Sequence, residues 1–225
     1  MFTARTLAPT GALSARVTRA PRAATVWAAF VAGLPRPGLP AEVFRYRVRN
    51  LPNLWRGTWK LLLAQLIKAP HFYGVVSARL RRANGEVLDF GVVSLRVVTT
   101  AGVNFIVDAF QNITEVENLK FHGVGTGGTA EAAGDTALVT ESTTILNPDS
   151  TRATGTTVEG ASANIYRTVG TVTFDGSGAI TEHGIFSQAA TGGGTLLDRS
   201  LFAAINVVSA DSIAFTYELT LTAGS

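Results

Sequence analysis

The stretch Ile213-Ala-Phe-Thr-Tyr-Glu-Leu-Thr-Leu-Thr222 alternates without interruption between large apolar side chains and small or polar ones. Successive side chains of a β-strand point to opposite faces of a sheet, so this alternation is typical of a strand with one buried face. The chain from about Val75 onward is similarly rich in Thr, with glycines at intervals. The sequence therefore predicts an antiparallel sheet protein.

Further strands are expected where similar stretches are separated by clusters of Gly, Asn, Asp and Ser. A hairpin comes first, with strands over 76–81 and 87–93 and with Asn84-Gly85 supplying the two positive-φ positions of a tight turn. The later strands are expected at 118–123, 152–158, 165–174, 179–187, 195–208 and 212–222. About eight strands at this spacing favour an antiparallel β-sandwich or a jelly roll.

One helix is expected to interrupt the strands. Val103, Ile106, Val107 and Phe110 have the spacing of a helical stripe, and Thr99 or Thr100 can cap its start. We expect this helix to cover the sheet.

The charge of the chain is divided between its two parts. Residues 1–96 carry 15 Lys and Arg against three acidic residues, a net +12, whereas residues 97–225 carry four against 13, a net −9. A basic arm on an acidic body could bind nucleic acid, an anionic membrane or the acidic face of a neighbouring copy, or simply dock against protein. The chain has no cysteine, which excludes disulfides and thiolate metal sites.

The first residues are predicted to form an extended arm, because arginines are scattered among Ala, Thr and Pro and no acidic residue precedes Glu42. The apolar stretch 23–34 imitates a secretory signal, but it starts late and a poor cleavage site, Leu39-Pro40-Ala41, follows it. It is also shorter than the roughly 20 apolar residues that cross a bilayer. We therefore expect neither export nor a membrane span.

A short amphipathic helix is expected after Pro52 and before Pro70. Its apolar face is formed by Trp55, Trp59, Leu62, Leu63, Leu66 and Ile67. We expect this face to pack on a partner or on the protein's own sheet rather than on lipid. Arg45, Arg47 and Arg49 precede it, so residues 1–74 are interpreted as a basic docking segment and residues 75–225 as the β-sandwich domain.

The motifs that could carry chemistry are weak. Residues 123–128 contain the pattern G-x-G-x-x-G, but no helix or parallel βαβ unit surrounds it and no Lys-Ser/Thr follows, so we interpret the glycines as a tight bend that leaves a strand. Of the histidines, only His183 adjoins a carboxylate, Glu182, and neighbours on a strand point to opposite faces. A catalytic triad of Ser187, His183 and Asp198 can be composed from the sequence, but any chain this rich in Ser and Thr allows such a set, so we do not predict it.

Asp198 and Arg199 are neighbours within one expected strand. We expect this pair to meet partners across an interface rather than each other. The sequence thus predicts no catalytic, cofactor or metal site, and no enzyme.

Several segments resemble a family of virion structural proteins of tailed double-stranded DNA bacteriophages. The resemblance is carried by Val92–Gly102, His122–Gly127, Asp135–Glu141, Tyr166–Gly170, Ile180–Phe186 and Leu197–Ser200. The segment Ile180–Phe186 is also similar to phage tail-fibre and collar domains. The likeness covers about residues 75–225, and it implies a β-sandwich, an oligomeric assembly and no catalysis.

The resemblance implies a place in the virion, with other capsid or tail proteins as partners. We expect a homo-oligomer, for example a trimer, without specific nucleic-acid recognition. A capsid decoration protein is preferred to a tail or collar protein, because the chain lacks a long repetitive shaft. A peripheral membrane module and a carbohydrate-binding surface module remain as alternatives.

Overall fold

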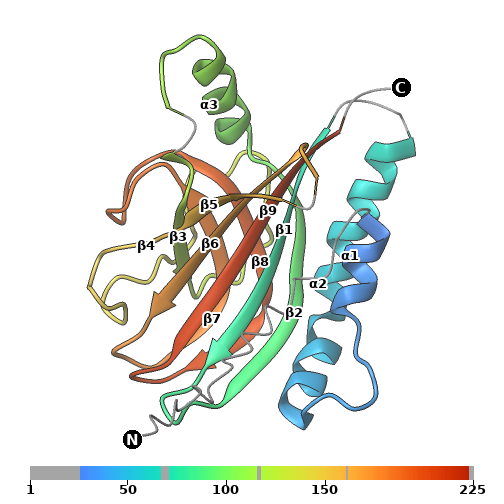
Figure 1. Ribbon diagram of the computed structural model, residues 1–225, viewed down its shortest axis with the longest axis vertical. Coiled ribbons are helices and arrows are strands. Elements are labelled where there is room, and N and C mark those ends of the chain that lie inside the picture. Colours follow the sequence, from blue (N-terminus) through green and yellow to red (C-terminus); the bar gives the residue numbers. More distant parts are fainter. Residues whose placement is uncertain (1–25, 67–70, 116–117, 161, 223–225) are drawn as a thin grey trace, which may run out of the picture.

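Two antiparallel sheets face each other, and a pair of helices packs along one edge of the two sheets (Figure 1). The computed structural model describes residues 26–66, 71–115, 118–160 and 162–222. Residues 1–25, the first part of the expected arm, lie outside the described residues. The mainly β, sandwich-like fold predicted from the sequence is confirmed.

The first sheet has the strand order β2-β1-β9-β6-β5, and the second has the order β4-β3-β7-β8. The strands are β1 His71–Arg81, β2 Val87–Val97, β3 Phe121–Gly125, β4 Ala153–Thr154, β5 Thr156–Glu159, β6 Ile165–Thr173, β7 Gly178–Phe186, β8 Leu196–Val207 and β9 Ser212–Thr222. The helices are α1 Val26–Gly33, α2 Ala41–Leu66 and α3 Thr100–Phe110. The boundary expected at residues 74 and 75 falls inside β1.

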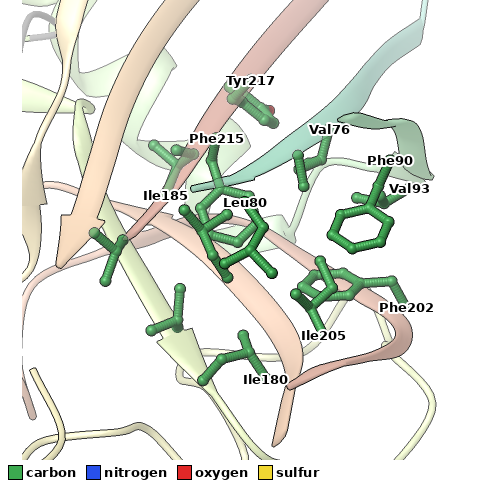
Figure 2. Packing of buried hydrophobic residues seen from close by; sticks show 14 of the residues in the cluster. Val76, Leu80, Phe90, Val93, Ile180, Ile185, Phe202, Ile205, Phe215 and Tyr217 are labelled. Atoms are coloured by element: carbon green, nitrogen blue, oxygen red, sulfur yellow. The ribbon is translucent and has the colours of Figure 1, made fainter. Parts of the chain in front are cut away.

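The core lies between the two sheets and is built by the alternation that the last strand shows in the sequence. Ile213, Phe215 and Tyr217 of β9 are fully buried. Phe202 of the opposite sheet lies against Phe215, with ring centroids 6.1 Å apart, and Ile180 belongs to the same cluster (Figure 2). Full burial of a large apolar side chain contributes about 1.5 to 3 kcal/mol. The contact between the two sheets therefore accounts for much of the stability of the fold.

The strand expected at 152–158 is in fact two strands in different sheets. β4 pairs with β3 in the second sheet, whereas β5 pairs with β6 in the first. Gly155 forms the corner between them, where a Cβ would lie 2.0 Å from Thr168 Oγ1. Only glycine leaves room for this crossing, and the alternating pattern alone does not reveal the change of sheet.

The β1–β2 hairpin is present, but its turn differs from the one expected. The Gly85 N–H donates to the Arg82 carbonyl over 2.9 Å, and residues 82–86 connect the strands. Gly85 has a φ of 88°, whereas Asn84 does not have a positive φ. The longer loop therefore needs one left-handed residue where a two-residue turn would need two.

The helix predicted after Thr99 is confirmed, together with its cap: Thr99 Oγ1 accepts a hydrogen bond from the Gly102 N–H over 3.0 Å. Its position differs from the expectation. Gly102 and Ile106 are buried, but Phe110 is largely exposed, and the helix projects from one end of the sandwich (Figure 1). The helices that pack on the first sheet are α1 and α2, which lie along its edge strand β2.

Candidate docking surface

Helix α2 is much longer than the helix expected after Pro52. It begins at Ala41 and contains Pro52, which lies on its exposed side. A proline inside a helix removes one backbone hydrogen bond. Here the helix is packed on both sides of the proline, because Tyr46 before it and Leu54 and Leu61 after it are buried. Tertiary packing therefore outweighs the local preference to break the helix.

The inner side of α2 is fixed to both sheets by Asn50. Its Nδ2 donates to the Val93 carbonyl of β2 over 2.8 Å, and its Oδ1 accepts from the Ala203 N–H of β8 over 2.8 Å. Both amide atoms of this buried side chain thus satisfy backbone groups of strands in different sheets. The helix is held at the edge where β2 and β8 meet.

Arg47 is one of the sequence-predicted docking residues, and the structure places it in the interior. Its Nη1 donates to the carbonyls of Ala32 and Leu34, each over 3.1 Å, and so fastens α1 to α2. Burial lowers the pKa of the Arg47 guanidinium. The side chain joins the two helices and is not part of their outer surface.

The outer side of the two helices carries an unusual group of exposed aromatic rings. All three tryptophans of the chain, Trp27, Trp55 and Trp59, are 52–54% exposed. Trp55 stacks on Trp59 with ring centroids 6.2 Å apart, and Phe30 meets the edge of Trp55 at 5.9 Å. Trp27 contacts Phe30 at 5.3 Å. Phe30 itself is only 9% exposed. We call the three tryptophans, together with the 46% exposed Leu63, the aromatic ridge.

The ridge exists because α2 is apolar on two sides. Leu54, Thr58 and Leu61 face the sheet and are buried, whereas Trp55 and Trp59 follow one residue later and face outward. The predicted stripe thus lies mainly on the outside. Its other members are Leu62, which is partly buried, Leu63 in the ridge, Leu66, whose side chain the structure does not describe, and Ile67, which lies outside the described residues.

Cations accompany the exposed apolar residues along α2. Arg45, Arg49 and Lys60 are exposed, and the one carboxylate of the helix, Glu42, pairs with Arg82 over 2.9 Å. An open groove of ≈590 Å³ lies at the start of the helix. We call it the basic groove; its lining residues are Glu42, Phe44, Arg45, Val48, Arg49 and Asn206.

Arg199 of the predicted Asp-Arg pair lies inside the molecule and has partners there. Its Nε donates to Glu182 over 2.8 Å, and its Nη1 donates to Asp135 over 3.0 Å. The Glu182 carboxylate also accepts three backbone N–H groups, from Gly127, Val139 and Thr140. The cluster therefore fastens the loop after β3 to the second sheet.

Asp198 lies on the other face of the same strand and is also fully buried. Its Oδ1 accepts from Ser200 Oγ over 3.0 Å. Burial raises the pKa of the Asp198 carboxyl to about 7, although Ser200 and Arg96 act in the opposite direction. Both members of the Asp-Arg pair are thus separated from the outer surface on which the aromatic ridge lies.

The glycines of the G-x-G pattern are explained by Glu182. A Cβ on Gly125 or Gly127 would lie 2.6 or 2.5 Å from Glu182 Oε1. The chain can approach the buried carboxylate only because these side chains are missing. The bend after β3 accords with the interpretation from the sequence, but the carboxylate that requires it comes from another strand and was missed.

Two of the three histidines, His122 and His183, form a buried pair. His122 Nδ1 lies 3.0 Å from His183 Nε2, and burial lowers the pKa of His122 to about 3. His183 and Glu182 point to opposite faces, as expected. Within the part of the chain that the structure describes, no group of three or more His, Cys, Asp or Glu residues could hold a metal ion.

The structure does not bring Ser187, His183 and Asp198 together as a triad. Ser187 Oγ accepts from the Thr195 N–H, His183 approaches His122, and Asp198 accepts from Ser200. Each of the three side chains is therefore occupied with a different neighbour.

Comparison of the chain with protein-family models, curated proteins and solved structures finds no match. Among the described helices, none is both long and apolar enough to span a bilayer. The aromatic ridge and the basic groove beside it are the surface features that most clearly point to a function.

Proposed function

We propose that this protein is a non-enzymatic structural component of a tailed bacteriophage particle, located on the capsid surface and seated there through the aromatic ridge. The observation that carries the proposal is the ridge itself: three half-exposed tryptophans on helices that are tightly held by the sandwich. The virion assignment is supported by the family resemblance of residues 75–225.

A ridge of this kind is suited to binding protein. Exposure of tryptophan side chains to water is energetically unfavourable, and tryptophans are enriched among the interface residues that contribute most to binding energy. Because Asn50 and Arg47 hold the helices before any partner arrives, little conformational entropy remains to be lost on association. The partner we propose is another virion protein with a complementary apolar groove and acidic rim, since the exposed cations lie along the same helix.

The rest of the molecule suits a passive role. The buried ion pair of Arg199 and Glu182 and the pair of Arg152 and Glu141 tie loops to the second sheet. These groups are held by internal partners, so they offer no converging reactive set on a surface. Within the virion, the capsid surface is the position that we propose, and the tail or collar is the alternative.

A peripheral membrane module is the second candidate, because tryptophans beside arginines and lysines also suit a lipid interface. Flotation of the full chain with vesicles of anionic and of zwitterionic lipid separates the two proposals. Salt-sensitive flotation with anionic vesicles, lost in a Trp55→Ser/Trp59→Ser variant, would favour the membrane. The virion proposal predicts that the chain stays in the unbound fraction with both kinds of vesicle.

Immunogold labelling of intact particles, followed by reconstruction of the particle, tests the virion proposal. We expect label over the capsid surface and density for the sandwich with the aromatic ridge against a neighbouring protein. Density confined to the tail would overturn the capsid position, and unlabelled particles would overturn the virion assignment as a whole.

A further inference from the structure

The end of α3 carries the two most exposed large apolar side chains among the described residues. Phe110 is 81% exposed and Ile113 is 68% exposed, and Val107 beside them is 45% exposed. We call these three residues the α3 knob. Large apolar side chains that project together from a protein are typical of a contact surface rather than of a solvated one.

The knob is held in a fixed shape. Asn112 has a φ of 58°, and this left-handed residue turns the chain back on the helix. The Ile113 N–H donates to the Asp108 carbonyl over 3.0 Å, and the Gln111 N–H donates to the carbonyls of Val107 and Asp108. These bonds close the helix end and fix the backbone that presents Phe110 and Ile113.

The knob is accompanied by negative charge. Asp108 lies in the last turn of α3 and Glu115 lies just beyond the knob. In the ion pairs seen among the described residues, neither carboxylate takes part. The knob thus has two carboxylates close to it in the chain, one in the turn that carries Phe110 and one two residues after Ile113.

The basic groove has the complementary composition. Phe44 and Val48, 41% and 43% exposed, are its apolar lining and lie one helical turn apart, and Arg45 and Arg49 line it with the same spacing. No described carboxylate forms an ion pair with either arginine. A groove of ≈590 Å³ is large enough to receive one or two large apolar side chains.

The knob cannot reach the groove of its own chain. Helix α3 lies at one end of the long axis of the molecule, and the first turns of α2 lie at the other end (Figure 1). We propose that the α3 knob of one copy seats in the basic groove of a second copy. Asp108 and Glu115 of one copy then face Arg45 and Arg49 of the other, and the association is head to tail. This inference does not depend on the viral assignment.

A head-to-tail contact uses two different surfaces, so every bound copy still offers one free knob and one free groove. Such contacts produce rings when the rotation between copies closes and open chains when it does not. The contact is small, about 1,000 Å² of buried surface or less, so an isolated contact is expected to be weak. Complementary charge makes it sensitive to salt.

The test is sedimentation velocity of the full chain, from about 1 to 200 µM. Wild type is expected to form larger species as its concentration rises. Phe110→Asp lacks the knob and Val48→Asp lacks the groove, so each alone is expected to remain a monomer. An equimolar mixture is expected to form dimers and nothing larger, because only one competent knob and groove remain per pair. Val158→Asp, at a 45% exposed site on β5, is the matched control and should assemble like wild type.

A charge exchange covers the case in which an apolar change disturbs folding. Arg49→Glu is expected to weaken self-association by about tenfold, and Glu115→Arg in the same chain to restore it. A wild type that stays monomeric overturns the proposal, as do single variants that assemble like wild type, a mixture that forms no dimer, and a charge exchange that restores nothing.

Discussion

Gly57 of α2 lies directly against the backbone of β2, where a Cβ built on it would stand 1.9 Å from the carbonyl oxygen of Leu95. Real Cβ atoms do not approach an oxygen so closely, so the helix and the strand are as near as glycine allows. The same close contact holds Trp55 and Trp59, on the neighbouring side of α2, in a fixed outward position. The aromatic ridge is therefore a preformed surface.

Replacing Gly57 by alanine is expected to push α2 away from β2. We expect the free energy of unfolding to fall by about 1 to 3 kcal/mol, although alanine is intrinsically the better helix former. Urea unfolding followed by circular dichroism measures the change. Gly128→Ala is the control, because nothing lies within 4 Å of a Cβ at that position. Equal stability of the two variants would show that the helix is not held by this contact.

Replacing Glu182 by glutamine is expected to leave Arg199 buried without its full countercharge and to place an amide group against backbone N–H donors. The expected loss is about 3 to 5 kcal/mol of unfolding free energy. The same measurement on Arg79→Gln, which removes an exposed ion pair to Asp89, should show at most about 1 kcal/mol. Similar losses in both variants would contradict the role given to the Glu182 cluster.

Asp198 is expected to make the stability depend on pH. Its pKa in the folded protein is raised to about 7 from an ordinary 3.8, mainly by burial, so the native state keeps a proton that the unfolded chain releases between these values. The raised pKa therefore adds to the free energy of unfolding below pH 3.8. This stabilisation is lost as the pH rises from 3.8 toward 7, by at most about 1.4 kcal/mol per pH unit.

Asp198→Asn should remove this loss. The variant is expected to differ little from wild type near pH 4 and to be the more stable of the two at pH 8, as measured by urea unfolding at several pH values. The same change at the exposed Asp149 removes a carboxylate without altering the interior and serves as the control. A difference between Asp198→Asn and wild type that is constant with pH would contradict the burial of a protonated Asp198.

The elements that could be predicted from the sequence are those set by local patterns. The two-residue alternation of β9 is confirmed by the full burial of Ile213, Phe215 and Tyr217. The start of α3 could be predicted because the Thr99 hydroxyl and the Gly102 N–H that it caps are three residues apart. Neither of these features depends on a distant segment.

The orientation of α2 could not be predicted in the same way, because two of its sides are apolar. Periodicity favours the face with Trp55 and Trp59, whereas the sheet takes the face with Leu54, Gly57 and Leu61. Gly57 is the signal that distinguishes them, since a small residue marks the side on which a helix can approach a strand most closely. The long Trp side chains would keep the helix too far away.

The buried charge pairs could not be predicted, because their members are distant in the sequence. Arg199 bonds to Glu182, 17 residues away, and to Asp135, 64 residues away. Adjacent residues on a strand face opposite sides, so Asp198 cannot be the ionic partner of Arg199 although the two are neighbours in the sequence. The sequence alone does not reveal Glu182 and Asp135 as partners of Arg199, and an interface was therefore expected at this position.

The proposal that the aromatic ridge seats this protein on another virion protein is tested most directly by incorporation into particles. Particles assembled with Trp55→Ser/Trp59→Ser in place of wild type are purified, and the copies per particle are counted by quantitative mass spectrometry. Val139→Ser, at a 52% exposed position between β3 and β4 that is distant in sequence from the aromatic ridge, is the control. All three proteins should have unfolding free energies within about 1 kcal/mol of one another. We predict that the double variant is lost from the particles while wild type and the control are retained; incorporation of the double variant at the wild-type level would contradict the proposal.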